Sequence, residues 1–312
     1  HIEIVYQDMK RYFFNPTPQN LEANQESALQ LAKDSVILVF GGAQGITTAL
    51  VSELSKEYPC NYILLGRSEQ PSAELEVYKE LDTKDKIRKY LIMEEKMKSP
   101  AEIEKKVQRI YKANQIRVNI EKIEKTGAKV TYKSLDIKDE KMLREFIRET
   151  YETYGRIDGV FHAAGLLDDK LFIHKTMDSF DNVYLTKVTP LHVLLEELRP
   201  GIKLFVMFSS VASSYGNRGQ TDYASANSVF DMTASILSEK TEARVLTINW
   251  GPWKGTGMVS DSLEAEFKKR GVSLIPLKAG AEYFVKELKY GTDNHVLVMG
   301  GAEDVKNFLR NS

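Results

Sequence analysis

The sequence predicts an α/β fold with a doubly wound parallel sheet, on three observations. Short apolar runs alternate with longer amphipathic stretches, a Gly-rich turn follows the first long run, and polar residues follow several others. Such polar residues would gather at the carboxyl edge of a parallel sheet. We expect strands at Val36–Phe40, Tyr62–Leu65, Lys129–Leu135, Gly159–His162, Leu204–Phe208, Arg244–Asn249 and His295–Val298, and helices near 46–57, 139–153, 179–197, 221–238 and 278–289.

Two segments do not belong to this minimal pattern. Residues 1–34 hold a short hairpin-like piece, Glu3–Tyr6 and Arg11–Phe14, and a polar stretch. Residues 72–127 form a long insertion after the second strand, rich in Lys, Glu and Ile at helical spacing. We expect two helices there, about 73–96 and 101–126, with Pro100 starting the second. The insertion's charges are interpreted as a solvated face, and the main domain is expected to cover residues 35–312.

The composition is that of a globular protein of 312 residues, with 42% hydrophobic and 28% charged residues. Lys and Arg total 43 against 44 Asp and Glu, so the charge balance gives no reason to expect nucleic acid or anionic lipid as a partner. No apolar run approaches the ~20 residues that span a bilayer. The single Cys60 excludes an internal disulfide and a Cys-based zinc cluster, and no metal site is expected. We expect a cytoplasmic protein in which Cys60 is a buried small hydrophobe.

The turn Gly41–Thr47 opens the first predicted helix. Glycines there let the backbone approach a pyrophosphate, which the amides at the start of a helix can bind. A tight connection with no ligand is an equally good interpretation of this motif alone. The candidate contacts are Gly41, Gly42, Gln44, Gly45 and Ile46.

The end of the second strand favours NADPH over NADH. Arg67 stands where an NAD-binding protein would place a carboxylate, and its fork suits a 2′-phosphate. Ser68 can add a donor, and the nearby Glu69 weakens the case slightly. Asp136, followed by Ile137, would accept from the adenine amino group or would cap the next helix. Small residues at Ala163, Ala164 and Gly165 would let a ribose approach the backbone, and His162 is expected to be structural.

A candidate catalytic group combines Ser210, Tyr223 and Lys187. Ser210 ends a strand, and Tyr223 follows thirteen residues later, one helical turn before Asn227. A phenol can protonate the oxygen of a ketone that receives a hydride, provided that a neighbouring cation such as Lys187 lowers the phenol's pKa. Ser210 would hydrogen-bond the carbonyl oxygen, and Asn227 would position Lys187 and a water.

These residues resemble the ketoreductase domains of modular polyketide synthases and of polyunsaturated fatty acid synthases, within the Rossmann-type short-chain dehydrogenases and reductases. Gly41 and Gly45 show the family's Gly-x-x-x-Gly spacing, although Thr47 replaces its third glycine. Most of these enzymes carry Tyr-x-x-x-Lys, whereas this chain has Tyr223-x-x-x-Asn227 with the lysine at Lys187, the exchange typical of synthase ketoreductases. The resemblance covers about residues 34–300, including Asn249–Trp253 and the insertion. Residues 1–34 look like a remnant of the structural subdomain that precedes such domains, with His1 as an excision point.

The resemblance also implies a substrate and a product. The substrate would be a β-ketoacyl chain on the phosphopantetheine of an acyl carrier protein, beside neighbouring synthase domains. Leu167-Asp168-Asp169 looks like the fingerprint of B-type domains, which implies a D-configured hydroxyl, usually (R)-3-hydroxy; Met207 stands where A-type domains have Trp. An exposed turn is the alternative for the two aspartates. Gln220 and Met258 complete the expected substrate contacts, and Gly255–Met258 would begin a lid.

Three other functions remain open. A nucleotide-sugar epimerase or dehydratase would share the fold, but Asn227 and the short segment after Val298 argue against it. A non-reducing domain that binds NADPH only for structure would be expected to lack Tyr223, Ser210 or Lys187, and all three are present. A free-standing secondary-alcohol dehydrogenase is the third.

Overall fold

The structure, a computed structural model, describes residues 4–7, 9–13, 16–21, 27, 29–69, 71–255, 261–301, 303–305 and 307. Within these residues a seven-stranded sheet has the order β5-β4-β3-β6-β7-β8-β9, and every neighbouring pair is parallel. The predicted doubly wound parallel sheet is therefore confirmed. Its strands are β3 (Val36–Phe40), β4 (Asn61–Gly66), β5 (Lys129–Ser134), β6 (Gly159–His162), β7 (Leu204–Ser210), β8 (Arg244–Trp250) and β9 (His295–Val298).

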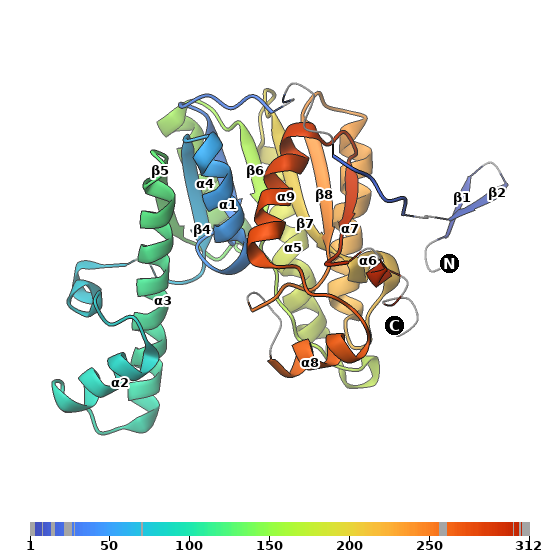
Figure 1. The fold of residues 1–312 in the computed structure, drawn as a ribbon. Helices are drawn as coiled ribbons and strands as arrows, with labels where there is room; N and C mark the ends of the chain where they lie inside the picture. Colours follow the sequence, from blue (N-terminus) through green and yellow to red (C-terminus); the bar gives the residue numbers. More distant parts are fainter. Residues whose placement is uncertain are drawn as a thin grey trace.

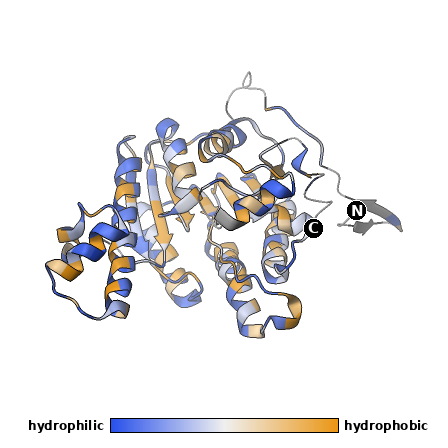
Figure 2. Cartoon of the chain, turned by 60° about the horizontal axis from the view of Figure 1, so that its bottom comes forward, coloured by the Kyte–Doolittle hydropathy of each residue, from blue (hydrophilic) through white to orange (hydrophobic). Residues whose placement is uncertain are grey.

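Helices cover both faces of this sheet (Figure 1). Side chains of β3 alternate between two cores: Ile37 and Val39 face one, and Val36, Leu38 and Phe40 face the other. The first core is closed by α1 (Gly45–Glu57), α9 (Leu277–Tyr290) and part of α3 (Pro100–Glu124), and the second by α4 (Glu140–Tyr154), α5 (Met177–Glu197) and α7 (Thr221–Ser238). Burial on both faces explains why the strands are near-continuous apolar runs, coloured mainly orange in Figure 2.

The strand order reverses direction between β3 and β6. From β3 the chain moves outward to β4 and β5, and then returns to β6 on the other side of β3. At such a switch point the loops after the two central strands diverge and leave a crevice at the carboxyl edge. The smaller elements α6 (Val211–Tyr215) and α8 (Asp261–Lys269) lie at this edge, and η2 (Phe172–His174) follows β6 in the chain.

The insertion differs from the prediction in its first half. In place of one helix over 73–96 there is a 3₁₀ segment, η1 (Ala73–Tyr78), followed by a separate helix, α2 (Lys84–Met93). Thr83 caps α2, its hydroxyl accepting from Lys86 N, so the helix begins there. The second helix was predicted well, and Pro100 does start α3. Buried side chains of η1, α2 and the first half of α3 form a small core of their own.

Near the start of the chain, β1 (Ile4–Gln7) and β2 (Lys10–Phe13) pair as an antiparallel hairpin, close to the predicted one. This pair forms its own two-stranded sheet. In the part of the chain that the structure describes, no helix has the length and apolar character of a membrane span.

Phe161 tests the packing of the first core. It is fully buried on β6, and its ring meets that of Phe284 edge-on, with centroids 5.5 Å apart. We expect Phe161→Ala to lower the free energy of unfolding by about 3–5 kcal/mol, because the cavity it leaves cannot collapse within a rigid sheet. Urea denaturation measures this. Val118→Ala, at an exposed position on α3, is the control, and equal small losses in both variants would contradict the packing described.

Candidate functional site

A cavity of about 800 Å³ lies at the carboxyl edge of the sheet. Most of the residues singled out in the sequence line it: Gly41, Gln44, Gly45, Ile46, Arg67, Ser68, Asp136, Ile137, Ala163, Ala164, Gly165, Leu167, Asp169, Lys187, Ser210, Gln220 and Tyr223. Gly42, Asp168 and Asn227 are not part of the lining. Met258 lies outside the described residues, as does most of the expected lid. Seven separated stretches of chain thus meet around one cavity.

Two glycines of the Gly-rich turn have backbone conformations that other residues rarely adopt. Gly41 has φ +80°, and a Cβ there would lie 3.1 Å from Ala164 Cα, so the turn packs backbone to backbone on the end of β6. Gly45, at the start of α1, has φ +63° with open space where a Cβ would point. The open amide end of α1 in this cavity fits a nucleotide pyrophosphate.

Arg67 and Ser68 follow β4 on the wall of the same cavity. The Tyr132 hydroxyl, from neighbouring β5, donates to Ser68 O at 2.7 Å and fixes this turn. Glu69 is engaged by Arg109 of α3, whose Nε and Nη2 donate to its two oxygens at 2.6 and 2.8 Å. A guanidinium and a hydroxyl at this position fit a 2′-phosphate.

Asp136 is not the cap of the next helix. That cap is Asp139, whose side chain accepts from Met142 N at 3.0 Å. Asp136 instead accepts from Lys138 N at 3.1 Å within its own turn, and it lines the cavity. The helix-cap alternative for Asp136 is therefore wrong, and its carboxylate borders the space beside β5.

Ser210, Tyr223 and Lys187 border the cavity from three elements. Ser210 ends β7, Tyr223 lies in the first turn of α7, and Lys187 lies in the middle of α5, which packs on α7. The Ser210 and Asn227 side chains hydrogen-bond Tyr223 and lower the pKa of its phenol, but burial has the larger effect and raises it above the usual value. The lowered pKa expected from the sequence is therefore not found in this state, in which the phenol keeps its proton.

Lys187 is buried, with 3% of its surface exposed. Its Nζ donates to Phe208 O at 2.7 Å and lies 4.4 Å from the centre of the Phe230 ring. Burial lowers the pKa of this ammonium to about 7, against a smaller opposing effect of Asp231. Asn227, expected to hold Lys187, instead donates to Tyr223 O one turn back in α7, at 2.8 Å. Its Oδ1 is buried without a hydrogen-bond partner among the described residues.

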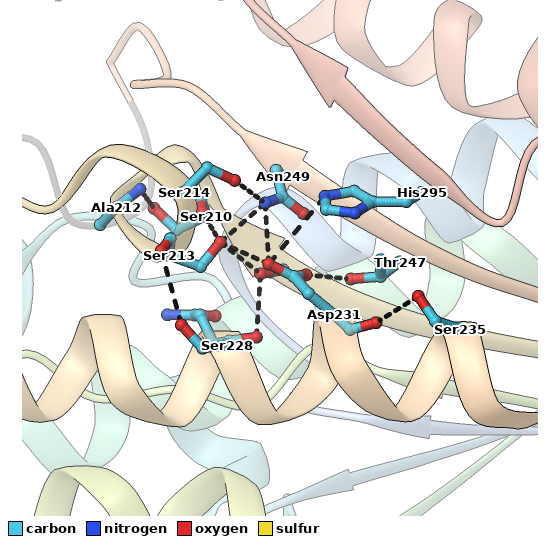
Figure 3. A network of polar contacts seen from close by, with 12 residues as sticks. Ser210, Ala212, Ser213, Ser214, Ser228, Asp231, Ser235, Thr247, Asn249 and His295 are labelled. Atoms are coloured by element: carbon cyan, nitrogen blue, oxygen red, sulfur yellow. Dashed lines mark hydrogen bonds and ion pairs between the residues drawn. The ribbon is translucent and has the colours of Figure 1, made fainter. Parts of the chain in front are cut away.

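A polar network centred on Asp231 lies behind Ser210 (Figure 3). The carboxylate of Asp231 accepts from the Ser213 hydroxyl, from Thr247 Oγ1 at 2.8 Å and from Asn249 Nδ2 at 3.0 Å. The Ser213 hydroxyl also lies 2.8 Å from Ser210 O. Through Ser213 this buried network fixes the end of β7, where Ser210 turns toward the cavity.

The two aspartates after Leu167 have different surroundings. Asp169 lines the cavity, and its Oδ2 accepts from Gln220 Nε2 at 2.9 Å. Asp168 points away, pairing with Lys170 at 2.8 Å and with the Ser179 hydroxyl. Behind them, Lys175 forms a buried ion pair with Asp222 at 2.6 Å and donates to Asp168 O. Asp169 is exposed, as the alternative expects, yet it lines the cavity, whereas Asp168 does not.

Comparison with known proteins assigns the chain to a family. A model of the KR domain matches residues 35–255. The chain belongs to the KR domain family. This membership, together with the fold, implies an oxidoreductase that binds a nicotinamide cofactor and reduces a ketone.

Two curated relatives are large synthases. A polyunsaturated fatty acid synthase chain of Thraustochytrium sp. is 34% identical over 281 residues, which cover 86% of this chain and 10% of that protein. Polyketide synthase PksN of Bacillus subtilis is 31% identical over 199 residues, which cover 61% of this chain and 4% of that protein. The KR domain described here therefore spans a tenth or less of the length of these relatives.

Solved structures share the fold of the KR domain. A ketoreductase domain from the bacillaene assembly line matches with a TM-score of 0.72 at 24% identity, over 98% of this chain and 64% of that one. A short chain dehydrogenase from Burkholderia cenocepacia J2315, in complex with NADP, matches with a TM-score of 0.62 at 15% identity, over 87% of this chain and 98% of that one. The sheet is therefore of the Rossmann type found in short-chain dehydrogenases.

Sequence reasoning missed two groups of residues in the cavity wall. One is apolar: Trp250, Trp253, Leu263 and Phe267, from the end of β8, the segment that follows it and α8. The other comes from the insertion: Arg109, Lys112 and Ile116 of α3, where the sequence predicted only a solvated face. A topological signal was available for the second group. The insertion leaves β4 at Arg67–Glu69 and returns to β5, the neighbouring strand, so it begins at the cavity rim.

The low pKa of Lys187 predicts how the stability of the KR domain depends on pH. Because its folded-state pKa, about 7, lies below the ordinary 10.5, burial of the charged form opposes folding, most strongly below pH 7. This cost shrinks as pH rises from 7 toward 10.5. We therefore expect Lys187→Met to gain stability relative to the wild type as pH falls from 10 toward 7.

Urea denaturation at several pH values measures that difference. Lys105→Met, at an exposed position on α3, is the control and should show no such trend. A Lys187→Met difference that stays constant between pH 7 and 10 would contradict the buried, low-pKa ammonium.

Proposed function

We propose that this KR domain reduces a β-ketoacyl thioester, tethered to the phosphopantetheine of an acyl carrier protein, with NADPH as reductant. The product would be the D-configured, (R)-3-hydroxyacyl thioester, within a polyketide or fatty acid synthase. The observation that carries this proposal is the meeting of Ser210, Tyr223 and Lys187 with the Gly-rich turn around one cavity. Each of these groups is common alone, but together they supply what carbonyl reduction beside a nucleotide needs.

Residues of this chain supply the proton and stabilise the negative charge that develops on the carbonyl oxygen. When bound, the reduced nicotinamide supplies a hydride to the carbonyl carbon. Tyr223 is protonated because burial raises its pKa, so its O–H bond can break as its proton moves to the carbonyl oxygen. The Ser210 hydroxyl, which already interacts with Tyr223, donates to the same oxygen as negative charge develops there. Lys187 provides a cation close behind, charged below pH 7 and increasingly neutral above it.

NADPH is supported by the charges beside β4. Arg67 and Ser68 line the cavity where a ribose 2′-phosphate would lie, and Glu69 is occupied by Arg109. The fold neighbour from Burkholderia cenocepacia was solved in complex with NADP. The carrier-bound substrate and the neighbouring domains are inferred from the synthase relatives. The product configuration rests on Leu167-Asp168-Asp169, of which Leu167 and Asp169 face the cavity.

Tyr223→Phe tests the proton donor. We expect turnover to fall by a factor of about 10² to 10⁴, because the ketone oxygen loses its acid, while NADPH affinity stays within about twofold of the wild type. NADPH oxidation with β-ketoacyl N-acetylcysteamine or carrier-bound thioesters measures turnover, and chiral analysis of the products tests the configuration. Tyr184→Phe removes a hydroxyl on α5 outside the cavity and is the control. Normal turnover in Tyr223→Phe would remove Tyr223 as the acid.

Arg67→Ala tests the choice of cofactor. Loss of a charge-assisted contact to phosphate costs about 1.5–3 kcal/mol, so NADPH should bind about 10- to 100-fold more weakly, with little change for NADH. Fluorescence titration of both cofactors measures this. Arg148→Ala, on the exposed side of α4, should change neither affinity. Equal losses for NADPH and NADH would refute a phosphate contact.

A further inference from the structure

Helix α3 of the insertion is fixed against the Gly-rich turn. Asn119 Nδ2 donates to Ala43 O, in that turn, at 2.9 Å. Three residues earlier, Ile116 is fully buried in the core that also holds Ala43, and it lines the cavity. The N-terminal half of α3 extends past the sheet with α2 (Figure 1). The middle of α3 therefore stands as a rigid wall beside the space that follows β4.

Two cations of α3 stand on that wall, one turn apart. Arg109 and Lys112 both line the cavity that Arg67, Ser68 and Glu69 also line, and Arg109 contacts Glu69 directly. Arg109 donates two parallel hydrogen bonds to the Glu69 carboxylate, and its Nη1 donates to Glu74 Oε1 at 3.4 Å. The hydrogen bonds from Arg109 lower the pKa of Glu69, so its carboxylate is charged at neutral pH.

Without the contact from Arg109, the negative charge of the Glu69 carboxylate would repel a 2′-phosphate. Nucleotide sites that prefer NAD place an acidic residue after the second strand, where it accepts from the ribose 2′-hydroxyl. Glu69 is two residues from Arg67 and could take that role or pair with Arg67. The bidentate contact from α3 occupies both of its oxygens and offsets its charge.

We propose that the insertion sets the preference of this KR domain for NADPH over NADH. Arg109 binds Glu69 and so keeps its carboxylate from contacting the ribose, and Lys112 adds a positive charge to the 2′-phosphate pocket. Arg109 is then a positioning residue, and Lys112 a specificity-determining one. The proposal rests on the proposed use of NADPH. It deepens that proposal by giving the insertion a part in selecting the phosphate.

Adenosine nucleotides test this without turnover. The probes are 2′,5′-ADP and 5′-AMP, which differ only in the 2′-phosphate, titrated calorimetrically into the whole chain. In Arg109→Ala we expect the preference for 2′,5′-ADP to fall about five- to tenfold, because Glu69 then faces the phosphate unscreened. In Glu69→Gln the preference should hold or rise. In the double variant Arg109→Ala/Glu69→Gln it should return to within about twofold of Glu69→Gln alone.

A second variant addresses Lys112 with a matched control. We expect Lys112→Ala to lower the 2′,5′-ADP preference about two- to fivefold, the range of an exposed charge at close approach. Lys122→Ala removes an exposed lysine from the same helix, outside the cavity, and should leave the preference unchanged. Unaltered 5′-AMP affinity in each variant shows that the fold and the rest of the site are intact.

The outcomes separate the two proposals. A wild-type chain that binds 2′,5′-ADP no better than 5′-AMP refutes the use of NADPH. A wild-type preference that survives in both Arg109→Ala and Lys112→Ala leaves NADPH in place and refutes the role of the insertion. A double variant that remains as weak as Arg109→Ala refutes the action through Glu69, because Arg109 would then contact the phosphate directly.

Discussion

The close approach of two backbones, at the turn after β3 and at the end of β6, is the constraint on which the site depends. Gly41 meets Ala163 and Ala164 at a distance that leaves no room for a side chain. This contact lies at the point where the strand order reverses, so it joins the half of the cavity lined by the Gly-rich turn to the half that holds Ser210 and Tyr223. A bulkier residue at Gly41 would move the turn away from β6 and separate these halves.

Burial controls the second half of the site. A phenol and an ammonium taken out of water both favour their neutral forms, and the two pKa values shift in opposite directions for that one reason. The counter-charge, Asp231, lies in a network that also holds Ser213, Thr247 and Asn249 (Figure 3). It stabilises the ammonium of Lys187 from a distance. The site therefore combines an acid that keeps its proton with a cation whose charge varies near neutral pH.

Local patterns in the sequence predicted the fold and much of the site. Parallel strands buried on both faces leave an apolar signal, and residues after their carboxyl ends must converge, which is why Arg67, Ser210 and Tyr223 could be placed together. Packing between distant segments leaves no such signal. The contact of Asp169 with Gln220 and the place of Arg109 on the cavity wall each depend on a neighbour remote in the chain.

The buried pair of Lys175 and Asp222 has a mechanical consequence for the wall of the cavity. Asp222 directly precedes Tyr223, and Lys175 also holds the backbone of Asp168, so one cation clamps the loop after β6 to the first turn of α7. Separating them would strand a charge away from water, at a cost of about 3–5 kcal/mol. The loop after β6 and the start of α7 are therefore held rigidly together. Movement of the cavity wall would thus fall to other elements, such as α8, from which Leu263 and Phe267 line the cavity.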